Sequence, residues 1–326
     1  METERSVDSN IAFIFPGQGS QHVGMGRDIF ENFGEARYIL EESSDILGID
    51  MKKLILGDDE RALNMTENTQ PAILTVSMAI LTVIRKEYGI KPVCTAGHSL
   101  GEYSANVFAG SVDFHHALLI TKKRGFFMQN ACPPLFGKMA AIIGLEENII
   151  KSVLSDINGS EDKDGIFAAN FNSPIQIVIS GLSLLVDEAC AILKEKGAKR
   201  IAILPVSAPF HTPFMKEARK NLSDYMNRDW FSDANCEIFS NVTSFNYSKK
   251  NDVINFLLEQ MTSPVRWNES VLNMIKSFNV KTFIEIGPSN VLSGLTKRID
   301  KSAGSFSVNS ISALKELEKK LLINSR

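Results

Sequence analysis

The segment 97–101, Gly-His-Ser-Leu-Gly, carries the clearest chemical signal in the sequence. It follows the apolar residues 93–96, which predict a strand, and precedes 102–108, which predict a helix. Flanking glycines let a chain turn sharply and present the Ser99 hydroxyl at the end of the strand, as in a nucleophile elbow. The Leu100 amide would then lie at a helix N-terminus, where it can stabilise an oxyanion. The alternative is a glycine-flanked serine in a tight turn with no chemical role.

A serine hydroxyl is a poor nucleophile near neutral pH and needs a positioned base. The candidates are the five histidines of the chain: His22, His98, His115, His116 and His211. His98 adjoins the serine in a tight turn, where its side chain would point away, and the pair at 115–116 opens a predicted helix as solvated or capping residues. His211 lies in the proline-flanked segment 205–213 and is the best candidate. The alternative for His211 is a loop histidine that hydrogen-bonds locally.

The elements around these residues predict a layered α/β fold. The apolar run 11–15 ends in the glycine-rich segment 16–21 and predicts a buried strand, as does 93–96. Helical patterns cover 27–47 and the uniformly apolar segment 71–84, which we expect to be a buried helix. Alternation of strand and helix is typical of a mostly parallel sheet.

The pattern changes between about residues 138 and 206. The order becomes β-α-β-β-α-β, which is typical of a ferredoxin-like unit, with elements expected at 139–145, 146–157, 166–172, 176–181, 184–196 and 200–206. Beyond it the α/β pattern resumes, with elements expected at 215–226, 237–242, 252–261 and 282–286 and a helix from 290. We therefore predict a large α/β subdomain, 1–134 and 206–326, with a small inserted subdomain, 135–205. A cleft between the two is a common place for an active site.

Composition excludes several classes of protein. The 326 residues include 35 Lys and Arg against 38 Asp and Glu, a net charge of −3, so a basic face for nucleic acid has little support. The apolar fraction of 44% and the charged fraction of 22% are those of an ordinary soluble globular protein. The apolar segment 71–84 is shorter than the roughly 20 residues of a membrane-spanning helix, and the polar N-terminus lacks the features of a signal or transit peptide.

The four cysteines, at 94, 132, 190 and 236, lie too far apart for a zinc or redox motif. We expect reduced thiols, no bound metal and a cytoplasmic location.

Six segments, taken together and in order, resemble the malonyl-CoA:acyl-carrier-protein transacylases. They are Phe-Pro-Gly-Gln-Gly-Ser-Gln at 15–21, Gly-His-Ser-Leu-Gly-Glu-Tyr at 97–103, Lys-Arg-Gly at 123–125, Pro-Phe-His at 209–211, Gln260-Met261 before Pro-Val-Arg-Trp at 264–267, and Glu-Ile-Gly-Pro at 285–288. The resemblance runs from residue 11 to about residue 300. It implies an α/β-hydrolase-like large lobe that carries an inserted ferredoxin-like (βαββαβ) lobe, in agreement with the pattern of elements.

The resemblance also implies a role for individual residues. Ser99 would be the nucleophile and His211 its base, and the backbone carbonyl of Gln260 would orient the imidazole, giving a Ser-His dyad without an aspartate. The backbone amides of Gln18 and Leu100 would bind the oxyanion.

Two further residues would select the acyl group. The resemblance assigns Arg124 to the free carboxylate of a malonyl group, which a planar guanidinium can hold through two parallel hydrogen bonds. By itself, an arginine beside Lys122 and Lys123 would more simply be part of a solvated basic face. Phe210, before the histidine, goes with malonyl rather than methylmalonyl units in similar acyltransferases, since a bulky ring leaves no space for an α-methyl group. Some members have serine there.

The implied function is a ping-pong transfer of malonyl from malonyl-CoA to the phosphopantetheine thiol of acyl carrier protein, through a malonyl-serine, supplying fatty acid synthesis. No cofactor is expected, because phosphopantetheine is carried by the partner, and we expect a monomer that binds neither nucleic acid nor membrane. An acidic carrier protein would dock on basic residues, for which the candidates are Lys194, Lys196, Lys199, Arg200, Lys297 and Arg298.

Three alternatives remain open at this point. They are a malonyl acyltransferase that serves polyketide synthesis in trans, a serine acyl hydrolase, and a catalytically idle subunit that binds carrier protein. A hydrolase would want an acidic partner for its histidine and gives no reason for the arginine.

Overall fold

Two β-sheets organise the chain in a computed structural model that describes residues 10–159, 165–206 and 208–324, with side chains to Lys320. The larger sheet has the strand order β10-β9-β1-β2-β7-β8. Its strands are β1 (Ile11–Phe15), β2 (Cys94–Gly97), β7 (Glu237–Phe239), β8 (Asn246–Tyr247), β9 (Thr282–Ile286) and β10 (Gly304–Val308). All neighbours are parallel except β8, which pairs antiparallel with β7. The carboxyl ends of β1 and β2 therefore lie side by side, and each leads into one of the predicted site segments.

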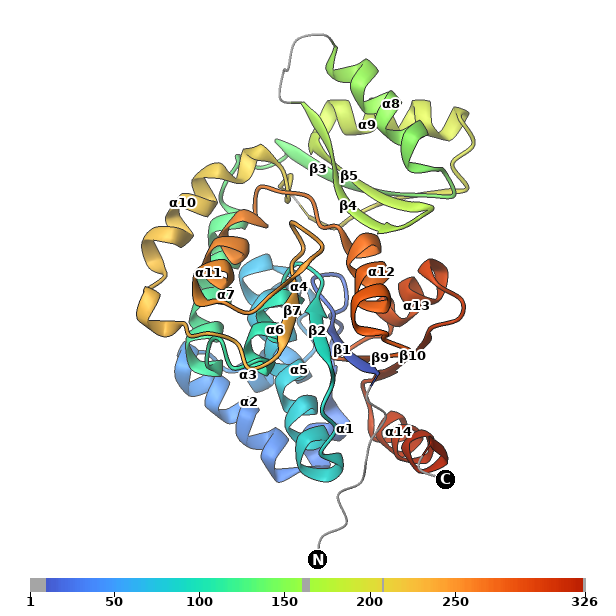
Figure 1. Ribbon diagram of the computed structural model, residues 1–326. Helices are drawn as coiled ribbons and strands as arrows, with labels where there is room; N and C mark the ends of the chain where they lie inside the picture. Colours follow the sequence, from blue (N-terminus) through green and yellow to red (C-terminus); the bar gives the residue numbers. More distant parts are fainter. Residues whose placement is uncertain (1–9, 160–164, 207, 325–326) are drawn as a thin grey trace, which may run out of the picture.

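Helices surround this sheet (Figure 1). They are α1 (Arg27–Asn32), α2 (Gly34–Leu47), α3 (Met51–Leu56), α4 (Glu60–Asn64), α5 (Thr66–Tyr88), α6 (Gly101–Phe108), α7 (Phe114–Gln129), α10 (Lys216–Tyr225), α11 (Lys250–Glu259), α12 (Trp267–Phe278), α13 (Val291–Ile299) and α14 (Ile311–Asn324), with short 3-10 turns at Pro213–Met215 and Arg228–Trp230. Helix α5 is buried along most of its length, as its uniformly apolar sequence predicts, and packs against α2 and α7. No helix among the described residues is both long and apolar enough to cross a membrane.

The helical pattern predicted at 27–47 is confirmed, but it is divided into two helices. The chain forms α1 and α2 with a break at Phe33, whose backbone is extended (φ −119°, ψ 120°). The Phe33 side chain packs against the main apolar core, and the Arg37 side chain donates hydrogen bonds to the carbonyl oxygens of Phe30 and Glu31 at the end of α1. These contacts compensate the chain for the helical hydrogen bonds lost at the break.

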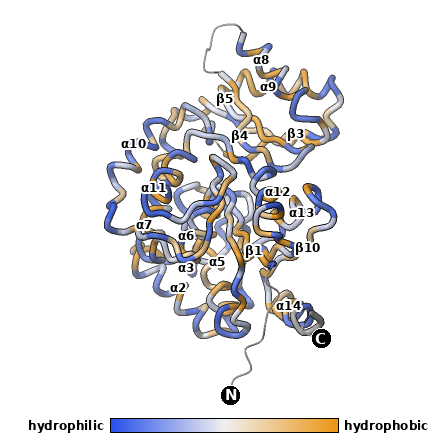
Figure 2. The backbone as a smooth tube through the Cα atoms, viewed as in Figure 1, coloured by the Kyte–Doolittle hydropathy of each residue, from blue (hydrophilic) through white to orange (hydrophobic). Residues whose placement is uncertain are grey.

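The second sheet is antiparallel and has the strand order β4-β5-β3-β6. Its elements follow the predicted β-α-β-β-α-β order: β3 (Gly137–Ile143), α8 (Glu147–Asn158), β4 (Ile166–Ser173), β5 (Gln176–Leu182), α9 (Ser183–Glu195) and β6 (Arg200–Ile203). Its apolar core is separate from that of the large sheet, and Figure 2 shows apolar residues running along β3, β4 and β5. We propose that this small subdomain spans 135–205, and that 1–134 and 206–326 form the large one.

Backbone hydrogen bonds join the two subdomains next to the elbow. The amide of Phe171 in β4 donates to the Val265 carbonyl (2.8 Å), and the Val265 amide donates to the Ala169 carbonyl (2.9 Å). Val265 lies two residues before α12, so one short segment of the large subdomain extends the small sheet. The cleft between the subdomains therefore has walls that are connected by backbone hydrogen bonds.

Candidate active site

Ser99 lies at a sharp turn between β2 and α6, with the backbone in the left-handed region (φ 51°). The flanking glycines are required by close approach of backbone. A Cβ on Gly97 would lie 1.9 Å from the Gly101 carbonyl, and a Cβ on Gly101 would lie 2.0 Å from the Phe15 carbonyl oxygen. The left-handed backbone of Ser99 is the strained conformation that is typical of a nucleophile elbow. The geometry is the one that the pentapeptide predicts.

Asn241, which follows β7, ties this turn to the sheet. Its Oδ1 accepts from the Ser99 amide (2.6 Å), and its Nδ2 donates to the Gly97 carbonyl (2.7 Å). The side chain is buried. Both polar ends of the amide are thus used to hold the elbow, a role that no local sequence signal identified.

His211 contacts the Ser99 hydroxyl directly. Its Nε2 lies 2.8 Å from Ser99 Oγ, and its Nδ1 lies 2.7 Å from the Gln260 backbone oxygen. A carbonyl oxygen can only accept, so Nδ1 carries the proton and Nε2 is left as an acceptor facing the serine. The tautomer needed in a general base is therefore set by a backbone carbonyl.

The surroundings of His211 keep its imidazole neutral. Burial and, to a smaller extent, the positive charge of Arg124 lower the pKa of His211 to about 3, although the hydrogen bond to Gln260 acts in the opposite direction. At neutral pH the imidazole is therefore unprotonated and available to take a proton.

Arg124 projects from α7 into the same site. It is 1% exposed. Its Nη1 donates to Gln70 Oε1 (2.8 Å), and its Nη2 donates to Gln260 Oε1 (2.7 Å) and to Ser99 Oγ (3.2 Å). The guanidinium carbon also lies 5.3 Å from the centre of the Tyr103 ring, within range of a cation-π interaction. These contacts exclude the solvated basic face as the setting of Arg124.

Gln18 and Leu100 border the site from two sides. Leu100 precedes α6, and Gln18 follows β1 with its side-chain amide donating to Thr66 Oγ1 (3.2 Å). Within the described chain, neither backbone N–H donates to a protein acceptor. Both residues line the cavity at Ser99. Two backbone N–H groups at the wall of this cavity, those of Gln18 and Leu100, fit the predicted oxyanion site.

The cavity at Ser99 is small, about 70 Å³, and every predicted site residue except Gln260 lines it. Its lining includes Gln18, Gln70, Ser99, Leu100, Arg124, Phe210 and His211, with Asn170, Leu204 and Val206 from the small subdomain and its connection. Phe210 is 6% exposed, and its carbonyl accepts from Ser180 Oγ in β5 (2.9 Å). The small subdomain thus both walls the cavity and anchors the residue before His211.

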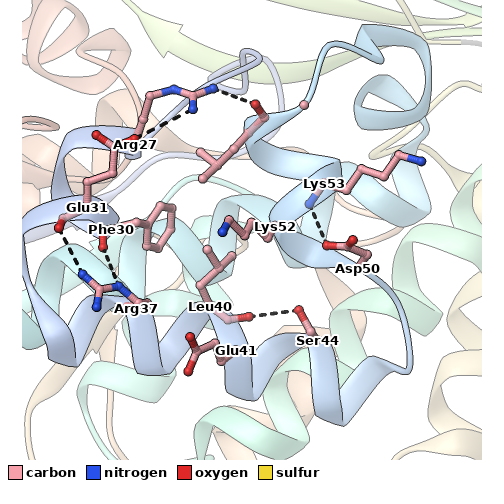
Figure 3. Close-up of a pocket in the computed structure, with 12 residues that line it drawn as sticks. Arg27, Phe30, Glu31, Arg37, Leu40, Glu41, Ser44, Asp50, Lys52 and Lys53 are labelled. Atoms are coloured by element: carbon pink, nitrogen blue, oxygen red, sulfur yellow. Dashed lines mark hydrogen bonds and ion pairs between the residues drawn. The ribbon is translucent and has the colours of Figure 1, made fainter.

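A much larger groove, about 600 Å³, lies elsewhere, between α1, α2 and α3 (Figure 3). Its arginines serve as helix caps. Arg27 donates to the Leu56 carbonyl at the end of α3 (2.6 Å), and Arg37 donates to the carbonyl oxygens that end α1. The groove contains no predicted site residue, so we do not place the chemistry there.

The remaining histidines have other partners. His98 Nε2 lies 2.8 Å from Asn172 Oδ1 across the subdomain boundary, and His116 Nδ1 lies 2.6 Å from Asp113 Oδ2 at the N-cap of α7. His22 and His115 are exposed. Within the described ranges, no cluster of three or more His, Cys, Asp or Glu residues could hold a metal ion, and the four cysteines are free thiols.

Comparisons with known proteins agree with this geometry. The family described as "Acyl transferase domain" matches residues 12–318. A malonyl CoA-acyl carrier protein transacylase of Bacillus subtilis (strain 168) is 43% identical over 301 residues, which cover 92% of this chain and 94% of that protein.

Solved structures show the same architecture. An acyl carrier protein S-malonyltransferase from Vibrio cholerae has a TM-score of 0.89 at 39% identity, covering 95% of this chain and 100% of that one. A malonyl-transacylase solved with a type II PKS acyl-carrier protein, PlMCAT:AntF, has a TM-score of 0.90 at 37% identity, covering 96% and 100%. The predicted fold class, an α/β-hydrolase-like lobe with an inserted ferredoxin-like lobe, is confirmed.

The lowered pKa of His211 predicts an unusual pH profile. Because the neutral imidazole is the active form, the rate of Ser99 acylation by p-nitrophenyl acetate should stay flat from pH 8 down to at least pH 5. In Arg124→Gln the lost positive charge should raise the His211 pKa. The pH below which the rate falls should therefore increase by about one unit or more. Stopped-flow burst rates measure both profiles. A wild-type rate that falls to half its maximum near pH 6.5 would contradict the lowered pKa of His211.

Proposed function

The chain belongs to the malonyl-CoA:acyl-carrier-protein transacylase family, and on that basis we propose that it transfers malonyl from malonyl-CoA to the phosphopantetheine thiol of an acyl carrier protein. The observation that carries the proposal is that Ser99 Oγ lies within hydrogen-bond distance of both His211 and Arg124. A nucleophile, its base and a fixed cation meet in one small cavity. That combination suits an acyl group with a carboxylate at its far end.

In the first half-reaction Ser99 Oγ attacks the thioester carbonyl while its proton passes to His211 Nε2. The negative charge that develops on the carbonyl oxygen is stabilised by the backbone amides of Leu100 and Gln18. When the C–S bond breaks, His211 returns the proton to the sulfur and coenzyme A leaves as a thiol. The malonyl group remains as an ester on Ser99, with its carboxylate bound to Arg124.

The second half-reaction runs in reverse with a new thiol. His211 takes the proton of the phosphopantetheine thiol, the sulfur attacks the malonyl ester, and the same amides stabilise the oxyanion. The C–O bond then breaks and the proton returns to Ser99. Both steps consist of proton transfer and oxyanion stabilisation, so the proposed chemistry requires neither a metal nor a redox cofactor.

Arg124 and Phe210 would select the acyl group. The buried Arg124 Nε has no hydrogen-bond partner among the described residues, and a guanidinium can donate two parallel hydrogen bonds to a carboxylate. Phe210 is buried at the cavity wall, where its ring limits the width available at the acyl α-carbon. The pair favours a short, unbranched, carboxylated acyl group such as malonyl.

Fatty acid synthesis is the pathway that we propose for the product. One observation favours the second candidate, trans-acting malonyl transfer in polyketide synthesis, since the PlMCAT:AntF complex pairs a similar malonyl-transacylase with a type II PKS carrier protein.

A serine hydrolase is disfavoured because a backbone carbonyl rather than an acid orients His211. We propose a monomer, and we propose a cytoplasmic location, which the free cysteines support.

Intact-mass measurement tests the proposed function. After brief incubation with malonyl-CoA the wild type should gain one malonyl group, and Ser99→Ala should gain none, because within the described residues no other hydroxyl contacts both a histidine and an arginine. Addition of holo acyl carrier protein should then remove the label and transfer it to the carrier protein. Loss of the label to water at the same rate without carrier protein would favour a hydrolase instead.

Replacing Arg124 tests the carboxylate contact. Arg124→Ala should lower kcat/KM for malonyl loading by about 30-fold or more, because removing one partner of a buried, hydrogen-bonded charge pair costs about 2–5 kcal/mol. Acetyl loading should fall much less or should rise, since an acetyl group has no carboxylate to lose. Undiminished malonyl transfer without a rise in acetyl transfer would rule out this role.

Carrier-protein docking is proposed on cations contributed by both subdomains. The six candidate residues are exposed. Arg200 is aligned with Ile143, which is also aligned with Gln176, and Gln176 Oε1 accepts from Arg298 Nη1 (2.8 Å). The start of β6 and helix α13 therefore lie at the same end of the small sheet, where an acidic partner could contact both.

Charge reversal distinguishes docking from chemistry. The double variant Arg200→Glu, Lys297→Glu should lower kcat/KM for carrier protein by about tenfold at low salt and leave malonyl-CoA loading within about twofold of wild type, because rim charges act mainly on association. Lys52→Glu, on the distant helix α3, serves as the control. Equal losses in both half-reactions would argue against docking at this surface.

A further inference from the structure

Glu102 is a buried acid for which the mechanism above has no use. It lies in the first turn of α6, is 0% exposed, and accepts hydrogen bonds from Gln260 Nε2 (2.7 Å), Tyr247 Oη (3.0 Å) and the Asn241 amide (3.4 Å). Burial raises the pKa of Glu102 to about 8, even though these hydrogen bonds and the charge of Arg124 lower it. All three partners donate, so both carboxyl oxygens of Glu102 act as acceptors here.

The Gln260 side chain connects Glu102 to the arginine. Its Oε1 accepts from Arg124 Nη2 (2.7 Å), while its Nε2 donates to Glu102 Oε2 (2.7 Å) and more weakly to the Ser99 carbonyl (3.3 Å). A guanidinium has only donors, and both Glu102 oxygens accept hydrogen bonds here, so this orientation of the amide satisfies both neighbours.

Turning the Gln260 amide over would break both contacts. Its NH₂ group would then face the Arg124 Nη2 donor, and its oxygen would face the Glu102 carboxylate. In the buried site, each of these like-with-like contacts leaves polar groups unsatisfied, which is costly. An acceptor at position 102 is therefore what holds Gln260 Oε1 against the guanidinium.

The amide also keeps the acid away from the cation. A carboxylate bonded directly to Arg124 would pair with it through two hydrogen bonds and cover the edge that a substrate carboxylate needs. Instead, the side-chain partners of the guanidinium are the neutral groups of Gln70, Gln260 and Ser99. The guanidinium is thus held in place while its charge remains available to a ligand.

We propose that Glu102, supported by Tyr247, is a positioning residue for acyl selection, acting through the Gln260 side chain to orient Arg124. This inference rests on the proposed function, because it assumes that Arg124 binds the malonyl carboxylate. It separates two tasks within Gln260, whose backbone carbonyl orients the base and whose side chain orients the cation. Loss of Glu102 should therefore affect carboxylated acyl groups selectively.

The test compares two acyl donors on purified full-length protein. Glu102→Met removes the acceptor at nearly constant size, and Glu102→Asp withdraws it by one methylene while keeping a carboxyl group. Each variant is assayed for single-turnover acylation of Ser99 by malonyl-CoA and by p-nitrophenyl acetate, which lacks a carboxylate, with Ser99→Ala as background. We expect the malonyl-to-acetyl rate ratio to fall about tenfold in Glu102→Met and at least threefold in Glu102→Asp.

Glu285 offers a matched control. It is also 0% exposed, and its carboxylate accepts from the amides of Leu292 and Ser293 at the start of α13, away from the site. Glu285→Met removes a buried carboxyl group and Glu285→Asp withdraws one by a methylene, in the same way as at position 102, and both should leave the ratio within twofold of wild type. Thermal unfolding shows which variants fold. If Glu102→Met does not fold, the rate ratio of Glu102→Asp alone is compared with wild type.

The outcomes separate the inference from the proposed function. A folded Glu102 variant whose two rates fall in parallel, or whose ratio stays within twofold of wild type, overturns the positioning role. A ratio that falls equally in the Glu285 variants also overturns it, because any buried acid would then have the same effect. Failure of the wild type to load malonyl on Ser99 would instead reject the proposed function itself.

Discussion

The site depends on one buried cation. Arg124 is almost fully removed from solvent, and burying a charge is costly unless hydrogen bonds replace its hydration. Here the side-chain acceptors are the amide oxygens of Gln70 and Gln260 and the Ser99 hydroxyl. Because none of these carries a negative charge, the positive charge of Arg124 is only weakly compensated. It acts on its surroundings in two ways: it disfavours protonation of His211, and it favours a ligand with a carboxylate.

The fold brings these groups together from distant parts of the chain. Ser99 comes from the turn after β2, Arg124 from α7, His211 from the segment that returns from the small subdomain, and Gln260 from the end of α11. The small subdomain contributes the opposite wall through β4 and anchors Phe210 through Ser180. Backbone hydrogen bonds between β4 and Val265 connect the two walls, so the position of His211 relative to Ser99 is supported from both subdomains.

Local patterns were sufficient to predict the main elements and the elbow. The strands predicted at 11–15 and 282–286 match β1 and β9, because a short apolar run bounded by turn residues can form few structures other than a buried strand. The small subdomain was predictable because its six elements follow a known order. The break at Phe33 was not, since it depends on the tertiary packing of that ring and on Arg37 capping α1. Helix α12, strand β10 and helix α14 were also not identified from the pattern.

The supporting residues of the site could not be predicted from the sequence. Gln70, Asn241 and Glu102 are ordinary polar residues in their local context, and their roles arise from contacts with residues far away in the chain. Glu102 lies inside the segment 97–103 that carries the family resemblance, yet its function as an acceptor depends on Gln260 and Tyr247. A burial pattern could indicate that such residues are buried, but the residues that they contact are known only from the fold.

A crystal structure of the enzyme carrying malonyl on Ser99 would show directly whether Arg124 binds the acyl carboxylate. We expect both carboxylate oxygens about 3 Å from nitrogens of the Arg124 guanidinium, the ester carbonyl oxygen facing the amides of Leu100 and Gln18, and Gln260 Oε1 still in contact with Arg124. A malonyl carboxylate that points to solvent, with Arg124 unchanged and bonded only to protein, would contradict this role of Arg124.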